Sequence, residues 1–322
     1  MEIYPLKFAP ILKQRLWGGQ KLHSHLNKPD QGPTVGESWE LSGVPGDISI
    51  VANGPYAGKS LKELIEANPQ EFLGQEVIRR FGTEFPILIK FIDASKDLSI
   101  QLHPGDKLAR ERHDSYGKTE MWYVMEADPG AELIIGFNRD SNREEYQRAL
   151  QSGTLTDLLH YEPVKEGDAF FINSGKIHAI GAGILLAEIQ QSSDVTYRVY
   201  DFDRRDAEGN LRELHTELAL DAIDFQKRDD FKIHYPTKPN EENPMVKSPY
   251  FTTVFWDLKA PVGRLYKDAR SFHAYVCVGG EAELALGGVQ VHIRRGETVL
   301  IPAAARDLSI STTHCQLLEV CL

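Results

Sequence analysis

A short pattern that occurs twice constrains the fold more than any other feature of this chain. The segment GDAFFINSG at 167–175, which continues to His178, aligns without gaps on GETVLIPAA at 296–304, which continues to Asp307. In each copy a glycine and an acidic residue turn the chain into an apolar strand, and a small residue turns it towards the next strand. Unless so short a match arose by chance, the sequence contains two related β units.

Strand-like runs separated by turn residues crowd the region from 85 to 202. Many short strands at close spacing are typical of a barrel or a sandwich. The runs lie at 85–93, 98–103, 120–125, 132–137, 168–172, 184–190 and 195–202, and helical patterns lie at 59–69, 142–160 and 213–225. We therefore expect a mainly β protein with helical insertions.

The chain divides where its composition changes. A stretch rich in Lys, Pro, Asn and Asp runs from 229 to 244 without apolar periodicity, which is typical of a connector. Residues 1–228 are expected to form a first domain with an N-terminal elaboration and a helical insertion. Residues 245–322 resume short strands and are expected to form a degenerate second domain without metal, because Asp307 stands where the first unit has His178.

Composition disfavours several classes of protein. With 322 residues and 41% hydrophobic content the chain can bury a substantial core. Its formal net charge of −11 disfavours a nucleic acid or an anionic membrane as partner, so an anionic small substrate would need a local cationic pocket. The N-terminus lacks the features of a secretion signal and no apolar stretch could span a bilayer, so we expect a cytoplasmic protein. Its cysteines, Cys277, Cys315 and Cys321, are expected to be buried structural thiols.

Four residues in strand-like contexts could close around one metal ion. In the run from 98 to 103, alternation puts Gln101 and His103 on one side of a strand. Glu120 opens a second apolar and aromatic run, and His178 follows the first copy of the repeat. The alternative for the first pair is an edge strand whose polar side meets water. Two imidazoles, a carboxylate and an amide oxygen nevertheless make a plausible ligand set.

The ligand types favour zinc without excluding other divalent metals. Imidazole nitrogen suits zinc, iron and manganese, whereas carboxylate and amide oxygens suit harder ions. Four protein ligands alone would close a tetrahedral structural site. A catalytic ion here would need a fifth or sixth position for substrate.

Charged residues near these ligands have two interpretations each. Asp194 and Arg198 lie on the same side of the strand-like run that leads to Tyr200. Either the two side chains form a surface salt bridge, or the guanidinium group of Arg198 points into the interior of the barrel. Lys118, two residues before Glu120, is either solvated or directed towards the metal. Lys90 interrupts the apolar run at 85–93, and it either reaches water or meets a partner or ligand.

Two Gly-containing segments near the N-terminus bring aromatic rings and carboxylates together. They are WGG at 17–19 and GESWE at 36–40. Trp17 and Glu40 could contact a sugar, although packing in the core is the commoner role of such aromatic residues.

Taken together, these motifs resemble the type I mannose-6-phosphate isomerases, in their short bacterial form. The resemblance covers essentially the whole chain. It is carried by WGG at 17–19, GESWE at 36–40, SIQLHP at 99–104, KTE at 118–120, the segment 167–178 and SDxxxR at 193–198. It implies a double cupin fold in which residues 1–228 form the metal-binding catalytic domain, with one zinc in the first barrel and a helical insertion, and residues 245–322 form a second barrel without metal. The extra helical domain of the long form is largely missing, so part of the pocket wall must be built differently or left open.

The resemblance also implies site residues and a reaction. The metal ligands would be Gln101, His103, Glu120 and His178. Lys118, Asp194 and Arg198 correspond to residues that are catalytic or that contact phosphate. The expected substrate-binding residues are Lys118, Arg198, Ser99, Lys90, Trp17 and Glu40.

The expected reaction interconverts D-mannose 6-phosphate and D-fructose 6-phosphate by moving a proton between C2 and C1 through an enediolate. We hypothesise that the metal polarises the O1/O2 side, that Arg198 adds a second positive charge, that Lys118 binds phosphate or helps to open the ring, and that Asp194 is the general base. Hydride transfer between the carbons is the alternative mechanism. The alternative functions are an isomerase of unphosphorylated sugars and a cupin that binds a sugar phosphate without turnover. As to assembly, we expect a monomer or a weak homodimer.

Overall fold

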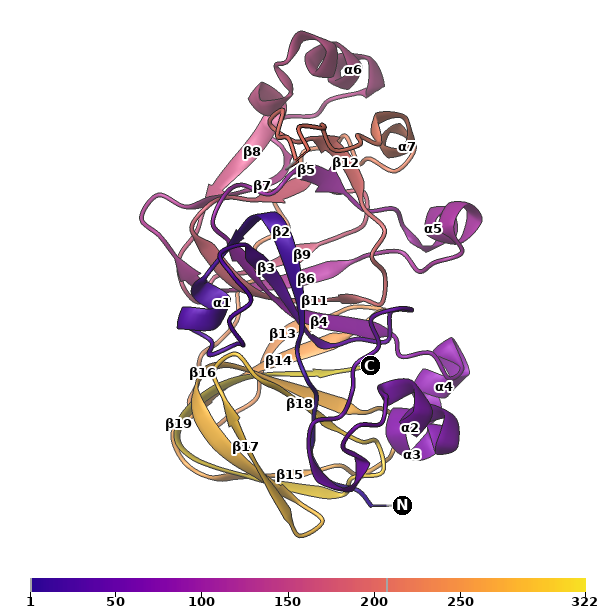
Figure 1. Ribbon diagram of the computed structural model, residues 1–322, viewed down its shortest axis with the longest axis vertical. Helices are drawn as coiled ribbons and strands as arrows, with labels where there is room; N and C mark the ends of the chain where they lie inside the picture. Colours follow the sequence, from indigo (N-terminus) through magenta and orange to yellow (C-terminus); the bar gives the residue numbers. More distant parts are fainter. Residues whose placement is uncertain (1, 207) are drawn as a thin grey trace.

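Two β structures stack along the long axis of the molecule (Figure 1). The computed structural model describes residues 2–206 and 208–322. The first structure is a barrel of two facing sheets, and the second is built on one eight-stranded sheet that curls on itself. A mainly β fold with helical insertions is therefore confirmed.

The inner sheet of the first barrel separates the barrel from the second β structure. Its strands, in spatial order, are β2 (Ile11–Gly19), β3 (Val35–Leu41), β4 (Ile87–Ala94), β11 (Ile184–Gln191), β6 (Glu120–Ala127) and β9 (Ala169–Ile172). Every residue of β4 is buried. Leu88, Lys90 and Ile92 face the interior of the first barrel, whereas Ile89 and Phe91 belong to the core shared with the second structure. Burial on both faces explains why this strand is apolar apart from Lys90 and Asp93.

The outer sheet completes the first barrel. Its strands, in spatial order, are β12 (Tyr197–Tyr200), β5 (Ile100–Leu102), β10 (His178–Ile180), β7 (Glu132–Phe137) and β8 (Leu159–Pro163). Strand β12 is shorter than the predicted run 195–202, because the chain before Tyr197 is a loop. All the strand pairs of both sheets are antiparallel.

The second sheet includes a strand from the start of the chain. Its strands, in spatial order, are β1 (Leu6–Lys7), β18 (Thr298–Ile301), β16 (His273–Leu286), β19 (Asp307–Cys321), β14 (Thr252–Leu258) and β13 (Asn243–Lys247), with β15 (Val262–Leu265) on β19 and β17 (Val289–Arg294) on β16. Because Leu6 pairs with Leu300, the N-terminal strand lies in the second structure rather than in the first. The predicted connector is also ordered, since the amide of Phe171 donates to Phe231 O at 2.8 Å.

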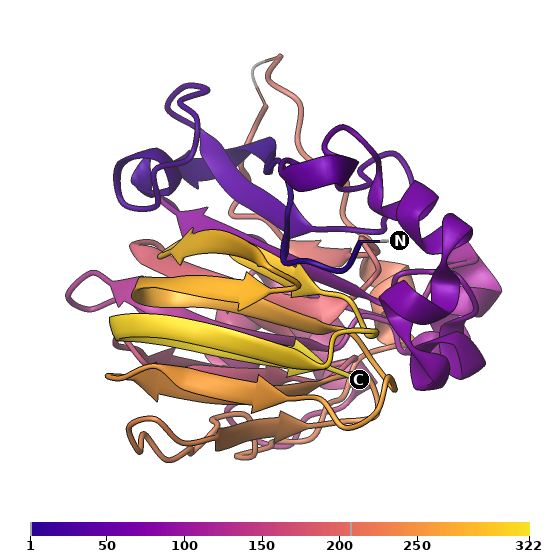
Figure 2. The ribbon, with the colours of Figure 1, turned by 90° about the horizontal axis from the view of Figure 1, so that it is seen from below.

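The helices are shorter than the predicted helical patterns. They are α1 (Lys21–Ser24), α2 (Leu61–Ala67), α3 (Pro69–Leu73), α4 (Gln75–Phe81), α5 (Asp106–His113), α6 (Arg143–Ser152) and α7 (Thr216–Leu220), with 3-10 turns η1 (Gly54–Tyr56) and η2 (Leu155–Leu158). Figure 2 shows the helical group that includes α2, α3 and α4 at one side of the second sheet. Ala303 there donates its amide to Phe72 O at 3.2 Å. None of the helices in the described residues has the length and apolar character needed to cross a membrane.

The sequence repeat corresponds to a structural repeat. Gly167 and Gly296 have φ angles of +85° and +87°, a turn conformation that favours glycine. Each is followed by a four-residue strand, β9 or β18. His178 then opens β10 and Asp307 opens β19. The two side chains differ in environment, because His178 is buried and Asp307 is exposed.

Candidate active site

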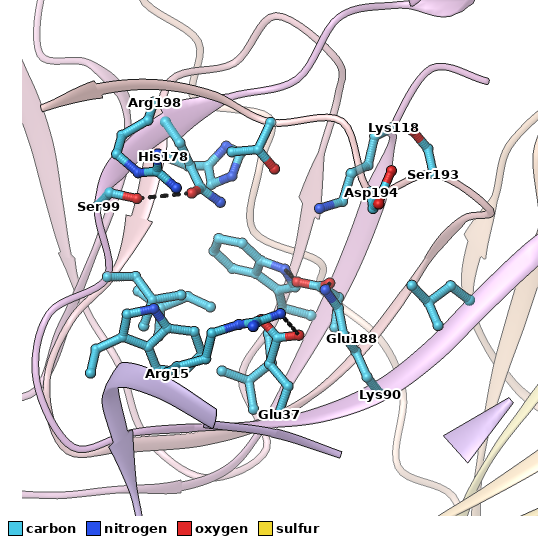
Figure 3. Close-up of a pocket in the computed structure, with 18 of the residues that line it drawn as sticks. Arg15, Glu37, Lys90, Ser99, Lys118, His178, Glu188, Ser193, Asp194 and Arg198 are labelled. Carbon is cyan, nitrogen blue, oxygen red and sulfur yellow. Dashed lines mark hydrogen bonds and ion pairs between the residues drawn. The ribbon is translucent and has the colours of Figure 1, made fainter. Parts of the chain in front are cut away.

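A cavity of about 380 Å³ lies inside the first barrel, between its two sheets. Its walls are polar and charged, with three tryptophans among them. Figure 3 shows Arg198 and Ser99 at one end of the view and Lys118 and Asp194 at the other. The lining residues are Arg15, Trp17, Glu37, Trp39, Leu88, Lys90, Ile92, Leu98, Ser99, Gln101, Lys118, Trp122, His178, Ile180, Glu188, Ser193, Asp194, Thr196, Arg198 and Arg212.

Three of the predicted metal ligands meet at this cavity. Nε2 of His103 lies 3.2 Å from Glu120 Oε1, and Nε2 of His178 lies 3.9 Å from Glu120 Oε2. One ligand atom from each of the three residues lies within 4.8 Å of the others. All three side chains are 1% exposed, so the cluster is isolated from bulk water.

The chemistry of this cluster fits a bound cation. Nδ1 of His103 lies 2.9 Å from Val195 O, and Nδ1 of His178 lies 2.8 Å from Lys176 O. When Nδ1 donates its proton in this way, the lone pair of Nε2 is free to bind a metal, which is how ligating histidines are oriented. The two Nε2 atoms and Glu120 Oε2 have no hydrogen-bond partner among the described residues. Buried polar atoms rarely stay unpaired, and a metal ion would satisfy all three.

The electrostatics of the cluster favour its ligating protonation state. Burial, and then the ammonium group of Lys118, lower the pKa of His103 to about 3. Burial also lowers the pKa of His178. Burial alone would raise the pKa of Glu120, but Lys118, His103 and His178 together outweigh burial and hold that pKa well below its ordinary value. Near pH 7 the site therefore offers two neutral imidazoles and one carboxylate, the forms that bind metals.

Gln101 lies beside the cluster in the outer sheet. On neighbouring strands it is directly opposite His178 and also opposite Arg198. Directly opposite residues point to the same face of a sheet, so the three side chains share the cavity face. The hydroxyl of Ser99 donates to Gln101 Oε1 at 3.1 Å, which leaves that oxygen a second lone pair. Its role as fourth ligand stays a prediction.

Both lysines singled out in the sequence are buried and paired. Nζ of Lys118 lies 3.1 Å from Glu120 Oε1, next to the metal cluster. Nζ of Lys90 lies 2.7 Å from Glu188 Oε1. Neither lysine is a solvated surface group, since their side chains are 6% and 7% exposed.

Two cavity carboxylates, Glu37 and Glu188, were not recognised from the sequence. Glu188 lies opposite Lys90 on the neighbouring strand and accepts from Trp122 Nε1 at 2.8 Å. Burial, and then the charge of Glu120, raise the pKa of Glu188. Burial would raise the pKa of Glu37 as well, but Lys90 and Arg15 lower it to about 2. For Glu188 the sequence did contain a signal, because this acidic residue interrupts the apolar run 184–189 just as Lys90 interrupts the apolar run 85–93.

Asp194 and Arg198 reach the cavity from different segments. Asp194 is exposed in the loop before β12, whereas Arg198 lies on β12 itself. Between the two the structure shows no ion pair, so the surface salt bridge considered from the sequence is not formed. Arg198 instead donates from Nη1 to Glu213 O at 2.9 Å, while its Nε lacks a partner within the described part of the chain.

Of the remaining predicted substrate contacts, Ser99 and Trp17 line the cavity, but Glu40 does not. Its carboxylate pairs with Lys28 at 2.7 Å, and both side chains are buried. Lys28 in turn lies over the ring of Phe91, on the opposite face of the inner sheet from the cavity. The prediction that Glu40 contacts substrate is therefore wrong, because strand alternation turns Glu37 inward and Glu40 outward.

Known proteins resemble this chain along its whole length. The family description "Phosphomannose isomerase type I, catalytic domain" matches residues 6–135, and "Mannose-6-phosphate isomerase, cupin domain" matches residues 241–322. The mannose-6-phosphate isomerase of Streptococcus mutans serotype c is 36% identical over 317 residues, which cover 96% of this chain and 98% of that protein. The chain belongs to the mannose-6-phosphate isomerase family.

Further members of this family agree in sequence and in structure. Mannose-6-phosphate isomerase ManA of Bacillus subtilis is 35% identical, over 94% of each chain. A crystal structure of the mannose 6-phosphate isomerase from Bacillus subtilis superposes with a TM-score of 0.90 at 33% identity and covers 98% of this chain and 99% of that chain. The family resemblance, the double cupin fold and the expectation of an isomerase are confirmed. The main functional interpretation is supported over its alternatives.

Proposed function

We propose that this member of the mannose-6-phosphate isomerase family interconverts D-mannose 6-phosphate and D-fructose 6-phosphate by proton transfer between C1 and C2. The observation that carries the proposal is the buried cluster of His103, Glu120 and His178. Its unpartnered atoms lie beside a cavity of about 380 Å³ that is lined by cationic, acidic and aromatic side chains. Such a site matches the needs of a polar, anionic sugar that must be held away from bulk water.

His103, Glu120 and His178, with Gln101 beside them, are proposed to hold one divalent ion. Zinc is our choice among divalent metals because two of these ligands are imidazoles. When bound, the ion supplies positive charge close to the oxygens on which the enediolate develops its negative charge. The fold orients the ligands independently of the ion, because Val195 O and Lys176 O hold the imidazole rings of His103 and His178 in place.

Lys118 is assigned to the reacting end of the substrate. Its ammonium group lies 3.1 Å from a carboxylate oxygen of the metal cluster, so it faces the sugar carbons rather than a remote phosphate. From there it can donate a hydrogen bond to O1 or to the ring oxygen during opening. Of the two roles considered from the sequence, ring opening therefore fits better than phosphate binding.

Asp194 is assigned as the proton carrier. It lines the cavity on the side of Lys118 and forms no ion pair with the rest of the described chain. The rival is Glu188, but Lys90 and the indole of Trp122 already bind its two oxygens. A carboxylate held in this way is better suited to orienting neighbours than to moving towards a carbon-bound proton.

The test is a coupled isomerase assay with mannose 6-phosphate and with mannose, before and after chelation. We expect formation of fructose 6-phosphate, loss of activity on chelation, and recovery with added zinc, manganese or cobalt. Wash-in of solvent deuterium at the transferred position would support proton transfer, whereas its absence would support a hydride shift. Equal values of kcat/KM for mannose and mannose 6-phosphate would contradict the proposed substrate.

Assembly and location remain proposals. The expectation of a monomer or weak homodimer can be checked by light scattering of the purified protein across a range of concentrations. A cytoplasmic location, without nucleic-acid or membrane partners, is proposed from the net charge of −11 and can be checked by fractionating cells.

A further inference from the structure

We infer that Arg212, acting with Arg198, binds the phosphate group of the substrate and thereby sets the preference for a phosphorylated sugar. The inference deepens the proposed function and rests on it. No sequence motif drew attention to Arg212, which lies in the segment between β12 and α7 and lines the cavity.

Asp201 holds Arg212 in a defined orientation. Nε of Arg212 donates to Asp201 Oδ2 at 2.7 Å, and its Nη2 donates to Oδ1. Asp201 is 4% exposed, so this paired contact is protected from water. Two parallel hydrogen bonds fix the plane of a guanidinium group. Its remaining nitrogen, Nη1, has no hydrogen-bond partner within the described chain and stays available to a ligand.

Main-chain contacts tie this segment to the strand that carries Arg198. The amide of His215 donates to Arg198 O at 2.7 Å, and Arg198 Nη1 donates to Glu213 O at 2.9 Å. Arg198 is half-buried, and its Nε has no partner within the described residues. Burial, and then the nearby charge of Arg212, lower the pKa of Arg198. Two half-buried guanidinium groups that line the same cavity favour an anion bound between them.

The balance of charge differs between the two ends of the cavity. Around the metal cluster and the inner sheet, three cationic side chains face three carboxylates. The pairs are Arg15 with Glu37 at 3.0 Å, Lys90 with Glu188 at 2.7 Å and Lys118 with Glu120 at 3.1 Å. The charges of these cations are already neutralised by their carboxylate partners, and those carboxylates would repel a phosphate placed there.

The other end carries uncompensated positive charge. Arg204 approaches the carboxylate of Asp201 to 3.3 Å but does not line the cavity. The single charge of Asp201 is therefore shared between Arg204 and Arg212, while Arg198 contacts only the carbonyl oxygen of Glu213, whose own side chain is exposed. A phosphate monoester carries a charge of about −1.5 to −2 near pH 7, which suits this excess.

The position of this anion site fits the length of the substrate. Gln101 lies between His178 and Arg198 on adjacent strands of one sheet. His178, Gln101 and Arg198 thus share one face of the outer sheet, and Arg212 lines the same cavity. A hexose phosphate can place C1 and C2 at the cluster and extend its C6 phosphate towards Arg198 and Arg212.

The experiment compares Arg212→Ala with wild type, using mannose 6-phosphate as substrate and inorganic phosphate as competitive inhibitor. We expect KM and the Ki for phosphate to rise about 10- to 100-fold, the range for a lost hydrogen bond to a charged group, with a smaller change in kcat. Weak inhibition by unphosphorylated mannose should be unchanged. Arg212→Lys keeps the charge but loses the paired contact with Asp201, so its KM should lie in between.

Arg204→Ala is the matched control, because it removes the other arginine on Asp201 without removing a cavity side chain. Its KM and phosphate Ki should stay within about twofold of wild type. Unchanged values in Arg212→Ala, or an equal rise in Arg204→Ala, would overturn the inference. If Arg212→Ala lowers the melting temperature, the KM of Arg212→Lys is the deciding measurement. A KM of Arg212→Lys equal to that of wild type would refute the role of the paired guanidinium group. A wild-type protein that forms no fructose 6-phosphate would contradict the proposed function itself, which separates the two failures.

Discussion

Replacing Lys90 with methionine should strongly destabilise the first barrel, because this lysine is buried among carboxylates. Its Nζ lies 2.7 Å from Glu188 Oε1, and the two side chains are 7% and 4% exposed. Lys90 also lowers the pKa of Glu37, the second carboxylate of the cavity wall. Methionine is unbranched and fills a similar volume, so the effect of the change is mainly electrostatic.

Removing one partner of a buried ion pair costs about 3–5 kcal/mol, because the other charge is left buried and uncompensated. Here Trp122 still donates to Glu188 at 2.8 Å and Arg15 still contacts Glu37, so we expect the lower end, about 3 kcal/mol. The matched control is Lys62→Met. Lys62 is 63% exposed and lies 3.7 Å from Glu66, and the loss should be at most about 0.5 kcal/mol.

The assay is denaturant unfolding followed by tryptophan fluorescence. Trp17, Trp39 and Trp122 line the cavity, so three of the four tryptophans report on this barrel. The double variant Lys90→Met/Glu188→Gln removes the orphaned charge and should be more stable than Lys90→Met alone. A loss below about 1 kcal/mol in Lys90→Met, or a double variant no more stable than the single one, would refute the reasoning.

The pH dependence gives an independent check. Burial raises the pKa of Glu188 above its ordinary value of 4.5, and removing Lys90 removes the main group that opposes this shift. The folded variant then holds a proton that the unfolded chain has already released. The destabilisation should be small below the ordinary pKa and should grow as the pH rises through the raised one. A destabilisation that is constant between pH 4 and pH 8 would contradict this explanation.

Three further predictions test the site. Asp194→Asn should lower kcat by about 100-fold or more with little change in KM, and a kcat within about tenfold of wild type would reassign the proton carrier. His178→Ala should reduce the bound metal, measured by elemental analysis, below one ion per chain, whereas His160→Ala, at a partly exposed histidine near Glu162, should not. Glu37→Gln should cost stability at pH 7; because the pKa of Glu37 falls from 4.5 to about 2 on folding, the difference should persist above pH 4.5 and disappear as the pH falls towards 2. Stability curves that stay parallel down to pH 2 would count against that ion pair.

The local patterns predicted strands well where a short apolar run lay next to turn residues. The run 85–93 became β4, and the repeat at 167–178 became a turn, a strand and the start of another strand. Helical patterns were predicted too long, because α6 ends at Ser152 and the chain then forms η2 and β8. The glycine at 153, with φ of +72°, marks that end.

Such local patterns could not predict which side chains meet between neighbouring strands. Glu37 and Glu40 stand three residues apart in one short motif, yet one carboxylate meets Arg15 at the cavity and the other meets Lys28 behind the sheet. Lys90 was recognised as unusual, but its partner Glu188 lies almost one hundred residues away and faces it only through the pairing of β4 with β11. Arg212 carries no local signal at all.

The sequence by itself determined which side chains alternate along each strand, where glycines turn the chain, and which residue types could hold a metal, because these properties depend on immediate neighbours. The tertiary structure decided which strands pair, in what register, and which charges therefore meet in the cavity. Register depends on how whole sheets pack against each other. For that reason the grouping of His103, Glu120 and His178, and the excess positive charge near Arg198, exist only in the folded protein.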